Sequence, residues 1–211
     1  MEDVKLVSEQ IQIPPQAPVM VLPNATLFPN TLLPLYIFEP RYRDMLAWSL
    51  EHHRMFCIAL MKPGLEEAKS TDEFHHIGGL GLIRACIGHE DGTSHLILQG
   101  LVRVEMTKFV QERPFRMARL APVTSEPPTA EEGEVLSAQI LEYCAHFQAK
   151  GAEIPETLDE QLANVNDPAA LCDIVAHTFV RDPHRRQLVL EQTRVAERMK
   201  TLIRHLGEES V

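Results

Sequence analysis

The first half of the chain has short apolar runs broken by prolines and glycines, whereas the second half carries apolar residues at helical spacing. Residues 19–50 contain three apolar pieces separated by Pro23, Pro29 and Pro34. Because proline fixes φ and has no backbone N–H, these pieces are predicted to be short strands, edge segments or turns. The sequence IFEPRYRDML then predicts a strand end that enters a helix, with Pro40 at the first helical position. The spacing i, i+3, i+4, i+7 predicts the buried face of that helix: Tyr42, Met45, Leu46 and Ser49.

The middle of the first half carries the strongest β-strand signals. Residues 54–61 form a continuous apolar run of strand length, and residues 77–106 hold two further apolar runs on either side of Asp91-Gly92. The Asp-Gly pair predicts a hairpin turn in which both positions have positive φ. Glycines within these runs predict bulges or sharp bends, as in a small, strongly curved barrel.

The strand that follows the hairpin includes a charged residue, Arg103. Residues 102–107 alternate between apolar and polar side chains. This strand is therefore predicted to bury one face and to expose the other, which carries Arg103. A last strand pair is predicted across residues 109–120.

A domain boundary is predicted in residues 121–133, because the sequence APVTSEPPTAEEG is rich in proline, serine and glutamate. We place a β domain at residues 1–122 and a helical domain at residues 123–211. Helix starts are predicted where an N-cap residue precedes proline or forms a capping box: Asp167-Pro168, Asp182-Pro183, Thr129 with Glu132, and Thr157 with Glu160. The apolar stripes between these starts predict a bundle of four or five helices.

Composition and charge narrow the possible classes of protein. Hydrophobic residues make up 45% and charged residues 24% of the chain, which is typical of a soluble globular protein. The chain has no apolar run of the roughly 18 residues that a membrane span needs, and its first residues lack the apolar core of a secretory signal. A cytoplasmic protein without membrane association is therefore expected. The formal net charge of -10 argues against general nucleic-acid binding, because such binding depends on basic charge.

The motifs of well-known catalytic, metal and cofactor sites are absent from the sequence. The four cysteines are far apart and form no CxxC pair, so they are expected to be small buried hydrophobic residues. The patterns GxxxxGK(S/T), HExxH and GxSxG do not occur. Adjacent histidines, as in the two His-His doublets, rarely bind one metal because their side chains diverge. We expect no catalytic residues, no metal and no cofactor.

Three arginines and one glutamate have two possible roles. Glu39 and Arg41 flank Pro40 where a predicted strand enters a helix. They could face a ligand as a polar cluster, or they could form a partly buried ion pair that fixes the junction, and the second role is favoured. The same alternatives hold for Arg84 and Arg103, which lie in otherwise apolar strands.

Three long segments carry a family resemblance. The first is LPNATLFPNTLLPLYIFEPRYRDML, and the second is IGGLGLIRACIGHEDGTSHLILQGLVRVEM, which includes a Gly-x-x-Arg element at residues 100–103. The third, PAALCDIVAHTFVRDPHRRQLVLEQTRVAERMKTLIRHL, contains Leu-x-Asp, Gln-Leu-x-Leu-Glu and Val-x-x-Arg. Together these segments cover most of residues 18–207 and resemble the Lon substrate-binding domain, the amino-terminal domain of the ATP-dependent protease Lon. The IFEPRYRDML form is similar to the stand-alone bacterial proteins of that family.

The resemblance implies an α+β fold in which a PUA-like β pseudobarrel is followed by a C-terminal helical bundle. It also implies substrate recognition, because this domain of Lon helps to capture substrates and to assemble subunits. Lon hydrolyses ATP and cuts peptides in domains that follow this one. The 211 residues contain no Walker motif and leave no room for a serine–lysine protease domain. We therefore expect a protein that is not an enzyme.

The leading hypothesis is a non-catalytic module that binds an unfolded or extended segment of another protein, or another protein partner. A concave surface between the β domain and the helices is the expected site. Phe38, Glu39, Arg41 and Tyr42 are expected to lie near that junction and, together with Arg103, to contact the partner. The identity of the partner and the oligomeric state stay open.

Two other classes of function are considered. PUA-like folds often bind RNA or modified nucleotides, and this hypothesis predicts a local basic cluster from Arg41, Arg43, Arg84, Arg103 and Arg113. A small enzyme would instead need a deep pocket that holds several histidines or carboxylates with shifted pKa values. No motif in the sequence indicates an enzyme, and the acidic composition argues against nucleic-acid binding.

Overall fold

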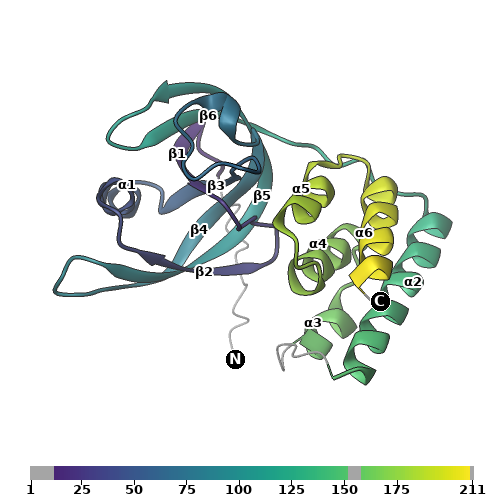
Figure 1. The fold of residues 1–211 in the computed structure, drawn as a ribbon. Coiled ribbons are helices and arrows are strands. Elements are labelled where there is room, and N and C mark those ends of the chain that lie inside the picture. Colours follow the sequence, from purple (N-terminus) through teal and green to yellow (C-terminus); the bar gives the residue numbers. More distant parts are fainter. Residues whose placement is uncertain (1–11, 152–157, 210–211) are drawn as a thin grey trace, which may run out of the picture.

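The structure, a computed structural model, describes residues 12–151 and 158–209. A six-stranded β half and a helical half lie side by side (Figure 1). One further helix, α1 (Pro40–Glu51), lies on the β half at the side away from the helical half (Figure 1). The fold is therefore α+β, a β pseudobarrel followed by a helical bundle, which confirms the fold expected from the sequence.

The β half precedes the helical half along the chain. The elements of the β half are β1 (Gln16–Leu22), β2 (Leu32–Ile37), α1, β3 (Met55–Leu60), a short 3-10 helix (Thr71–Glu73), β4 (Ile77–Gly88), β5 (Ser94–Gln111) and β6 (Arg116–Pro122). The helices of the second half are α2 (Ala130–Ala149), α3 (Leu158–Asn164), α4 (Pro168–Phe179), α5 (Pro183–Glu191) and α6 (Val195–Glu209). The proline-rich residues 123–129 connect the two halves.

The strands form one sheet that closes on itself. Their order is β2-β5-β4-β3-β1-β6, and an additional pairing of β5 with β6 closes the ring. β1 and β3 run parallel, and the other neighbours run antiparallel. β5 reaches β2, β4 and β6 because it is 18 residues long and is bent by register irregularities. Among the described strands, β2 pairs with β5 alone and so forms an edge.

The sequence of β3 explains its central place in the sheet. All six of its residues, MFCIAL, are buried, as expected for a strand whose two faces are both covered. Cys57 belongs to an apolar cluster that contains Phe74, whereas its neighbour Phe56 belongs to a cluster that includes the inner face of α1. The predicted buried face of α1 is confirmed: Tyr42, Met45, Leu46 and Ser49.

Two glycines let the segment before β2 pass close to the sheet. A Cβ atom at Gly79 would lie 2.1 Å from the carbonyl oxygen of Leu27, and one at Gly100 would lie 1.9 Å from that of Phe28. Both distances are far below van der Waals contact, so a side chain at either position would displace this segment. The close approach matters because Phe28, which precedes β2, is fully buried in the core of the helical half.

The predicted hairpin between β4 and β5 is confirmed, but its turn differs from the prediction. Residues 89–93 form the connection. Gly92 has a φ of 79°, whereas Asp91 does not have positive φ. The Asp91 carboxylate instead accepts hydrogen bonds from the N–H and the hydroxyl of Thr93, at 2.9 and 2.7 Å. This longer loop replaces the two-residue turn, which would need positive φ at both positions.

The helices α2–α6 pack around one apolar core to which each of them contributes. The side chains of Thr129, Asp167 and Asp182 each accept a hydrogen bond from a backbone N–H in the first turn of α2, α4 and α5, respectively. These contacts confirm three of the four predicted helix starts. The fourth, at Thr157, lies outside the described residues.

The substitution Gly79→Ala should lower the free energy of unfolding by about 2 kcal/mol or more, because the new methyl group would overlap the carbonyl of Leu27. Gly88→Ala on the same strand is the matched control, since the nearest atom to its Cβ would be the Ser94 hydroxyl oxygen at 3.9 Å. Urea titration measures both free energies. Equal stability of the two variants would contradict the close approach of this segment to β4.

Candidate functional site

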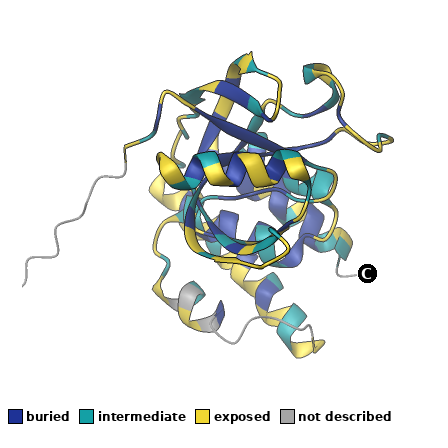
Figure 2. Ribbon diagram, turned by 90° about the vertical axis from the view of Figure 1, so that its left-hand side faces the viewer, coloured by how far each residue is buried: buried dark blue, intermediate teal, exposed yellow. Residues whose placement is uncertain are grey.

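The predicted site residues Phe38, Glu39, Arg41 and Tyr42 surround the N-terminus of α1. This helix packs on β1 and β3, at the side of the barrel away from α2–α6 (Figure 1). Figure 2 views the molecule from that side and shows the exposed residues of α1 facing outward. The expected position of these residues near the junction of the two halves is therefore wrong. The physical reason is that the apolar face of α1 covers the barrel cluster around Phe56, and this turns the helix away from the helical half.

Tyr42 is held inside the protein. Its hydroxyl donates to the carbonyl of Val21 at 2.9 Å and accepts from the N–H of Val21 at 3.3 Å. The residue is 6% exposed, and burial raises the pKa of its hydroxyl. Tyr42 therefore fixes α1 to β1 and presents little surface to a partner.

Arg41 forms an ion pair, the second of its two possible roles. Its Nε and Nη2 atoms lie 2.9 and 2.8 Å from the carboxylate of Glu39, and Nη1 donates to Glu67 at 2.8 Å. The Arg41 side chain is one-third exposed, and ion pairs at such positions typically contribute less than about 1 kcal/mol. Arg41 thus links the start of α1 to the loop between β3 and β4 while its side chain stays in contact with solvent.

Phe38 belongs to an exposed apolar surface on β2, β4 and β5. Phe38 is 57% exposed, Tyr36 49% and Ile87 66%. The Tyr36 ring stacks against both Phe38 and His95, with ring centroids 5.7 and 4.6 Å away. We call this surface the aromatic platform, which consists of Leu32, Pro34, Tyr36, Phe38, Ile87 and His95.

A hollow of about 400 Å³ lies on the aromatic platform. Its lining is mostly apolar: Pro34, Leu35, Tyr36, Ala85, Cys86, Ile87, His95, Leu96 and Ile97. Tyr36 and Ile87 were not predicted from the sequence as candidate binding residues. The two-residue period of a strand places Leu32, Pro34 and Tyr36 on one face, but periodicity does not tell whether another element covers that face.

The aromatic platform adjoins the free edge of β2. The N–H of Gly100 donates to the carbonyl of Thr31 at 2.9 Å, and in an antiparallel pair every second residue points its backbone groups at the partner strand. The backbone groups of Pro34 and Tyr36 therefore point toward the free edge. Because Pro34 has no N–H, this edge offers few donors to an added strand.

Arg103 lies in the junction between the two halves. Its guanidinium donates to both carboxylate oxygens of Asp173 on α4, and its Nε donates to the carbonyl of Leu190 on α5 at 2.9 Å. The Asp173 carboxylate also lies 3.8 Å from Arg198 on α6. The three charged side chains are 5% exposed or less. The predicted solvent-facing position of Arg103 is wrong, because the helical half covers this face of β5.

The short motifs of the family resemblance meet in this junction. Arg103 ends the Gly-x-x-Arg motif, Asp173 ends Leu-x-Asp, and Arg198 ends Val-x-x-Arg. The fourth motif, Gln-Leu-x-Leu-Glu, begins with Gln187, whose side chain donates a hydrogen bond to the carbonyl of Ile77 on β4 at 2.8 Å. Motifs that are far apart in the sequence thus hold the barrel and the helices together.

The substitution Asp173→Asn should lower the free energy of unfolding by about 3 to 5 kcal/mol, since it leaves two buried arginines without a counter-charge. Glu197→Gln is the control, because it breaks the exposed ion pair between Lys200 and Glu197 on α6 and should have little effect. Urea unfolding followed by circular dichroism measures both. If Asp173→Asn lowered the free energy of unfolding as little as the control does, the buried ion pair would not be needed for stability.

His177 lies at the end of α4, where the helical half meets β2. Burial, together with the positive charge of Arg186, lowers the pKa of its imidazole to about 4, whereas a hydrogen bond to the backbone of Leu32 acts in the opposite direction. Its Nδ1 atom is buried and has no hydrogen-bond partner within the described part of the chain. The imidazole of the folded protein is therefore neutral at pH 7.

Lowering the pH from 7 to 5 should destabilise the protein through His177. An unfolded histidine takes up a proton below its ordinary pKa of 6.5, whereas folded His177 resists protonation down to about pH 4. The unfolded state therefore binds more protons in this window, and the free energy of unfolding should fall by about 1 to 2 kcal/mol. His177→Gln should remove this part of the pH dependence, as measured by urea unfolding at both pH values. An unchanged pH dependence in the variant would argue against a buried, neutral His177.

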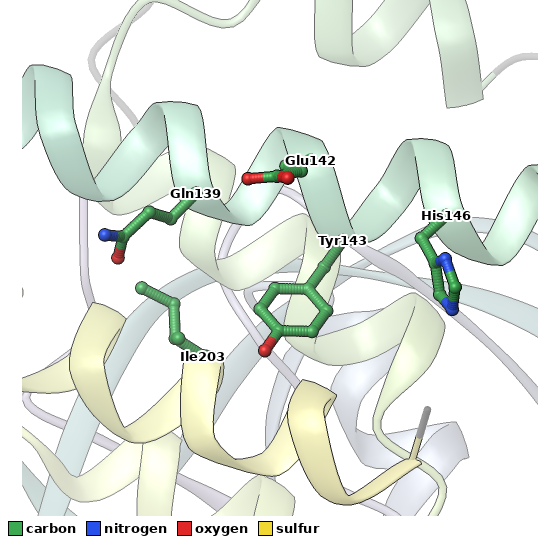
Figure 3. A pocket seen from close by; sticks show the side chains of 5 residues that line it. All are labelled: Gln139, Glu142, Tyr143, His146 and Ile203. Atoms are coloured by element: carbon green, nitrogen blue, oxygen red, sulfur yellow. The ribbon is translucent and has the colours of Figure 1, made fainter. Parts of the chain in front are cut away.

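A groove between α2 and α6 also carries titratable side chains. Gln139, Glu142, Tyr143 and His146 of α2 and Ile203 of α6 line this groove of about 500 Å³ (Figure 3). Tyr143 points toward α6 (Figure 3), where a Cβ at Gly207 would lie 3.2 Å from its hydroxyl oxygen. We assign no chemistry to this groove.

Three of the four cysteines are buried. Across residues 12–151 and 158–209, no group of three or more His, Cys, Asp or Glu side chains is arranged to hold a metal ion. Cys57, Cys144 and Cys172 are buried as expected, whereas Cys86 is half-buried. Burial raises the pKa of the Cys144 thiol to about 12. Within the same ranges, no helix combines the length and the apolar character needed to cross a membrane.

A family model of the substrate-binding domain of the ATP-dependent protease La (Lon) matches residues 16–208. The chain belongs to this family. The match extends over the barrel, the junction and the helical half, so the resemblance stated from the sequence is confirmed.

The relatives of this chain include Lon proteases that are much longer than it is. The Lon protease of Desulfosudis oleivorans is 27% identical over 201 residues, which are 94% of this chain and 24% of that protein. The Lon protease of Methylocella silvestris is 28% identical over 189 residues, which are 86% of this chain and 22% of that protein. The chain therefore spans about a quarter of the length of these relatives.

Solved Lon N-terminal domains share the fold of this chain. The N-terminal domain of the Mycobacterium avium complex Lon protease superposes with a TM-score of 0.73 at 17% identity, over 92% of this chain and 98% of that one. A Lon N-terminal domain protein from Xanthomonas campestris has a TM-score of 0.63 at 18% identity, over 90% and 97% of the two chains. At these identities the likeness demonstrates the fold alone.

Proposed function

We propose that this chain binds extended apolar segments of other proteins on the aromatic platform, and that it does so without catalysing a reaction. The observation that carries this proposal is the exposure of Tyr36, Phe38 and Ile87, each of which has about half or more of its surface in solvent. Large apolar side chains that gather on one exposed surface mark interaction sites. Membership of a family defined by a protease's substrate-binding domain supports a protein as the ligand.

The shape of the aromatic platform suits an extended segment. Tyr36 stacks against Phe38 and His95, so the three rings form a surface that loses little side-chain freedom when a ligand binds. The hollow of about 400 Å³ beside them has room for apolar side chains of the segment. In an extended segment, every second side chain would enter the hollow, and the side chains between them would face solvent.

Side-chain contacts rather than strand addition should dominate this binding. The free edge of β2 lies next to the aromatic platform, but Pro34 removes a donor from it. Glu39 and Arg41 follow Phe38 at the start of α1 and would supply a polar rim. Arg103 and Tyr42 are 5% and 6% exposed and are not part of the proposed surface.

The arginines of the RNA hypothesis do not support a nucleic-acid surface. Arg103 is buried in the junction. Arg43 lies against the β4–β5 loop, where its Nη2 atom would be 1.8 Å from a Cβ at Gly92. Arg41 and Arg113 line one pocket that includes neither Arg43 nor Arg84, so the five arginines do not form a single cluster. We therefore do not propose nucleic-acid binding.

A fluorescein-labelled, C-terminally amidated ten-residue peptide, in which phenylalanine or valine alternates with serine, tests the proposal by fluorescence anisotropy. The chain should bind it with a Kd below about 100 μM, which is the weak end of specific recognition. The double substitution Tyr36→Ala/Phe38→Ala should weaken binding about tenfold or more, because it removes two aromatic contacts.

The matched control is Val135→Ala/Leu188→Ala, which removes two side chains that are 53% and 51% exposed on α2 and α5, outside the aromatic platform. This variant should bind the peptide like the unmodified chain. No saturable binding below about 100 μM, or an equal loss of affinity in the control, would count against the proposed function.

A further inference from the structure

A second concave surface lies where α1, the β3–β4 loop and the β5–β6 loop meet. This pocket has a volume of about 730 Å³ and shares no lining residue with the hollow on the aromatic platform. Part of its lining is apolar and buried: Val19, Tyr42, Ala68 and Phe115 are 1%, 6%, 5% and 6% exposed. We call it the α1 pocket.

The charged side chains of the α1 pocket are mostly cationic. They are Arg41, Lys69, Arg113 and Arg116, together with Glu67 and Glu112. Two further carboxylates lie beside this lining: Glu39 pairs with Arg41, and Glu73 interacts electrostatically with Lys69 and Arg116. On a chain with a net charge of -10, the lining itself still holds more cations than carboxylates. Such a concave region focuses its potential and attracts an anionic ligand.

Two of the four cations are not held in a direct ion pair, although Glu73 interacts electrostatically with one of them, Lys69. Within the described ranges, neither Lys69 nor Arg113 forms an ion pair with a carboxylate. The Glu67 carboxylate lies 2.8 Å from Arg41, and the Glu112 carboxylate lies 3.3 Å from Arg116. An anion that enters the pocket would therefore meet two cations that no carboxylate contacts directly.

Arg116 adds a guanidinium group that is held in place by the protein. Its side chain is 12% exposed, and its Nη2 atom donates to the carbonyl of Ala68 at 2.6 Å. Its Nε atom is buried and makes no hydrogen bond to the described residues, although the Glu112 carboxylate lies 3.3 Å away. A buried donor without an acceptor is unfavourable. Glu112 is 54% exposed, so its side chain can turn into solvent and leave this donor to a better-placed acceptor.

We propose that the α1 pocket binds a carboxylate that is attached to an apolar group, as at the C-terminus of a peptide or on an acidic side chain with apolar neighbours. The carboxylate would replace Glu112 at Arg116 and would also meet Lys69 and Arg113, while the apolar group would lie against Phe115. A planar carboxylate matches the donor geometry of a guanidinium group. The internal partners of the arginines in this pocket are carboxylates as well.

The first test titrates the ¹⁵N-labelled chain with three probes: acetyl-Leu-Phe with a free carboxylate, the same dipeptide as its amide, and inorganic phosphate. The free acid should shift the backbone amide resonances of residues 112, 113, 115 and 116 in a saturable way. The amide should bind about tenfold more weakly or worse, because it lacks the charge that the cations recognise. A fourth probe, an amidated peptide with an internal glutamate between leucines, tells whether an acidic side chain serves as well as a C-terminus.

The second test uses the double substitution Lys69→Gln/Arg113→Gln. Both side chains are exposed, so the variant should fold, and its affinity for the free acid should fall about tenfold. The matched control, Arg84→Gln/Lys108→Gln, removes two exposed cations outside the α1 pocket and should change this affinity less than about twofold, because distant surface charges are screened by salt. Tyr36→Ala/Phe38→Ala should leave it unchanged, which separates the α1 pocket from the aromatic platform.

Three results would overturn the proposal. The first is equal affinity for the free acid and the amide. The second is phosphate binding as tight as that of the free acid, which would indicate a general anion site rather than a carboxylate site. The third is an equal loss of affinity in Lys69→Gln/Arg113→Gln and in its control.

Discussion

The buried ion pair between Arg103 and Asp173 is the contact on which the arrangement of the two halves depends. Removing two charges from water costs several kcal/mol for each ion, and this cost is offset only when every donor and acceptor is well placed. Here both carboxylate oxygens accept from Arg103, the Leu190 carbonyl accepts from its Nε, and Arg198 adds a second positive charge. Because the pair tolerates little displacement, it fixes β5 relative to α4, α5 and α6.

Features that depend on neighbouring residues could be predicted from the sequence. The buried face of α1 follows from its apolar spacing, and the central strand β3 follows from its continuous apolar run. The helix starts at Asp167 and Asp182 follow from an acid that precedes proline. The pseudobarrel fold was implied by the family resemblance, and the charged residues of the motifs that carry this resemblance come together at the junction around Asp173.

Features that depend on which element covers which face could not be predicted. The alternation around Arg103 correctly separates two faces of β5, but it does not show that the helical half covers the polar one. Phe38 was a candidate for contact with a partner, whereas Tyr36 and Ile87 were missed, because a period of two residues does not distinguish a covered face from an open one. The α1 pocket brings together residues from four separate segments. Arg41, Tyr42 and Arg113 had been considered from the sequence, whereas Lys69 and Arg116 had not.

Phe28 makes the two halves a single cooperative unit. It belongs to the segment between β1 and β2, yet its ring is part of the helical core. A barrel cut off before α2 would expose this ring and the charge of Arg103 to water, and a helical half expressed alone would contain a cavity the size of a phenylalanine side chain. Residues 123–129 therefore separate the two halves along the sequence, but neither half is expected to be stable without the other. Any longer protein that carries this module, whether natural or engineered, has to carry both halves together.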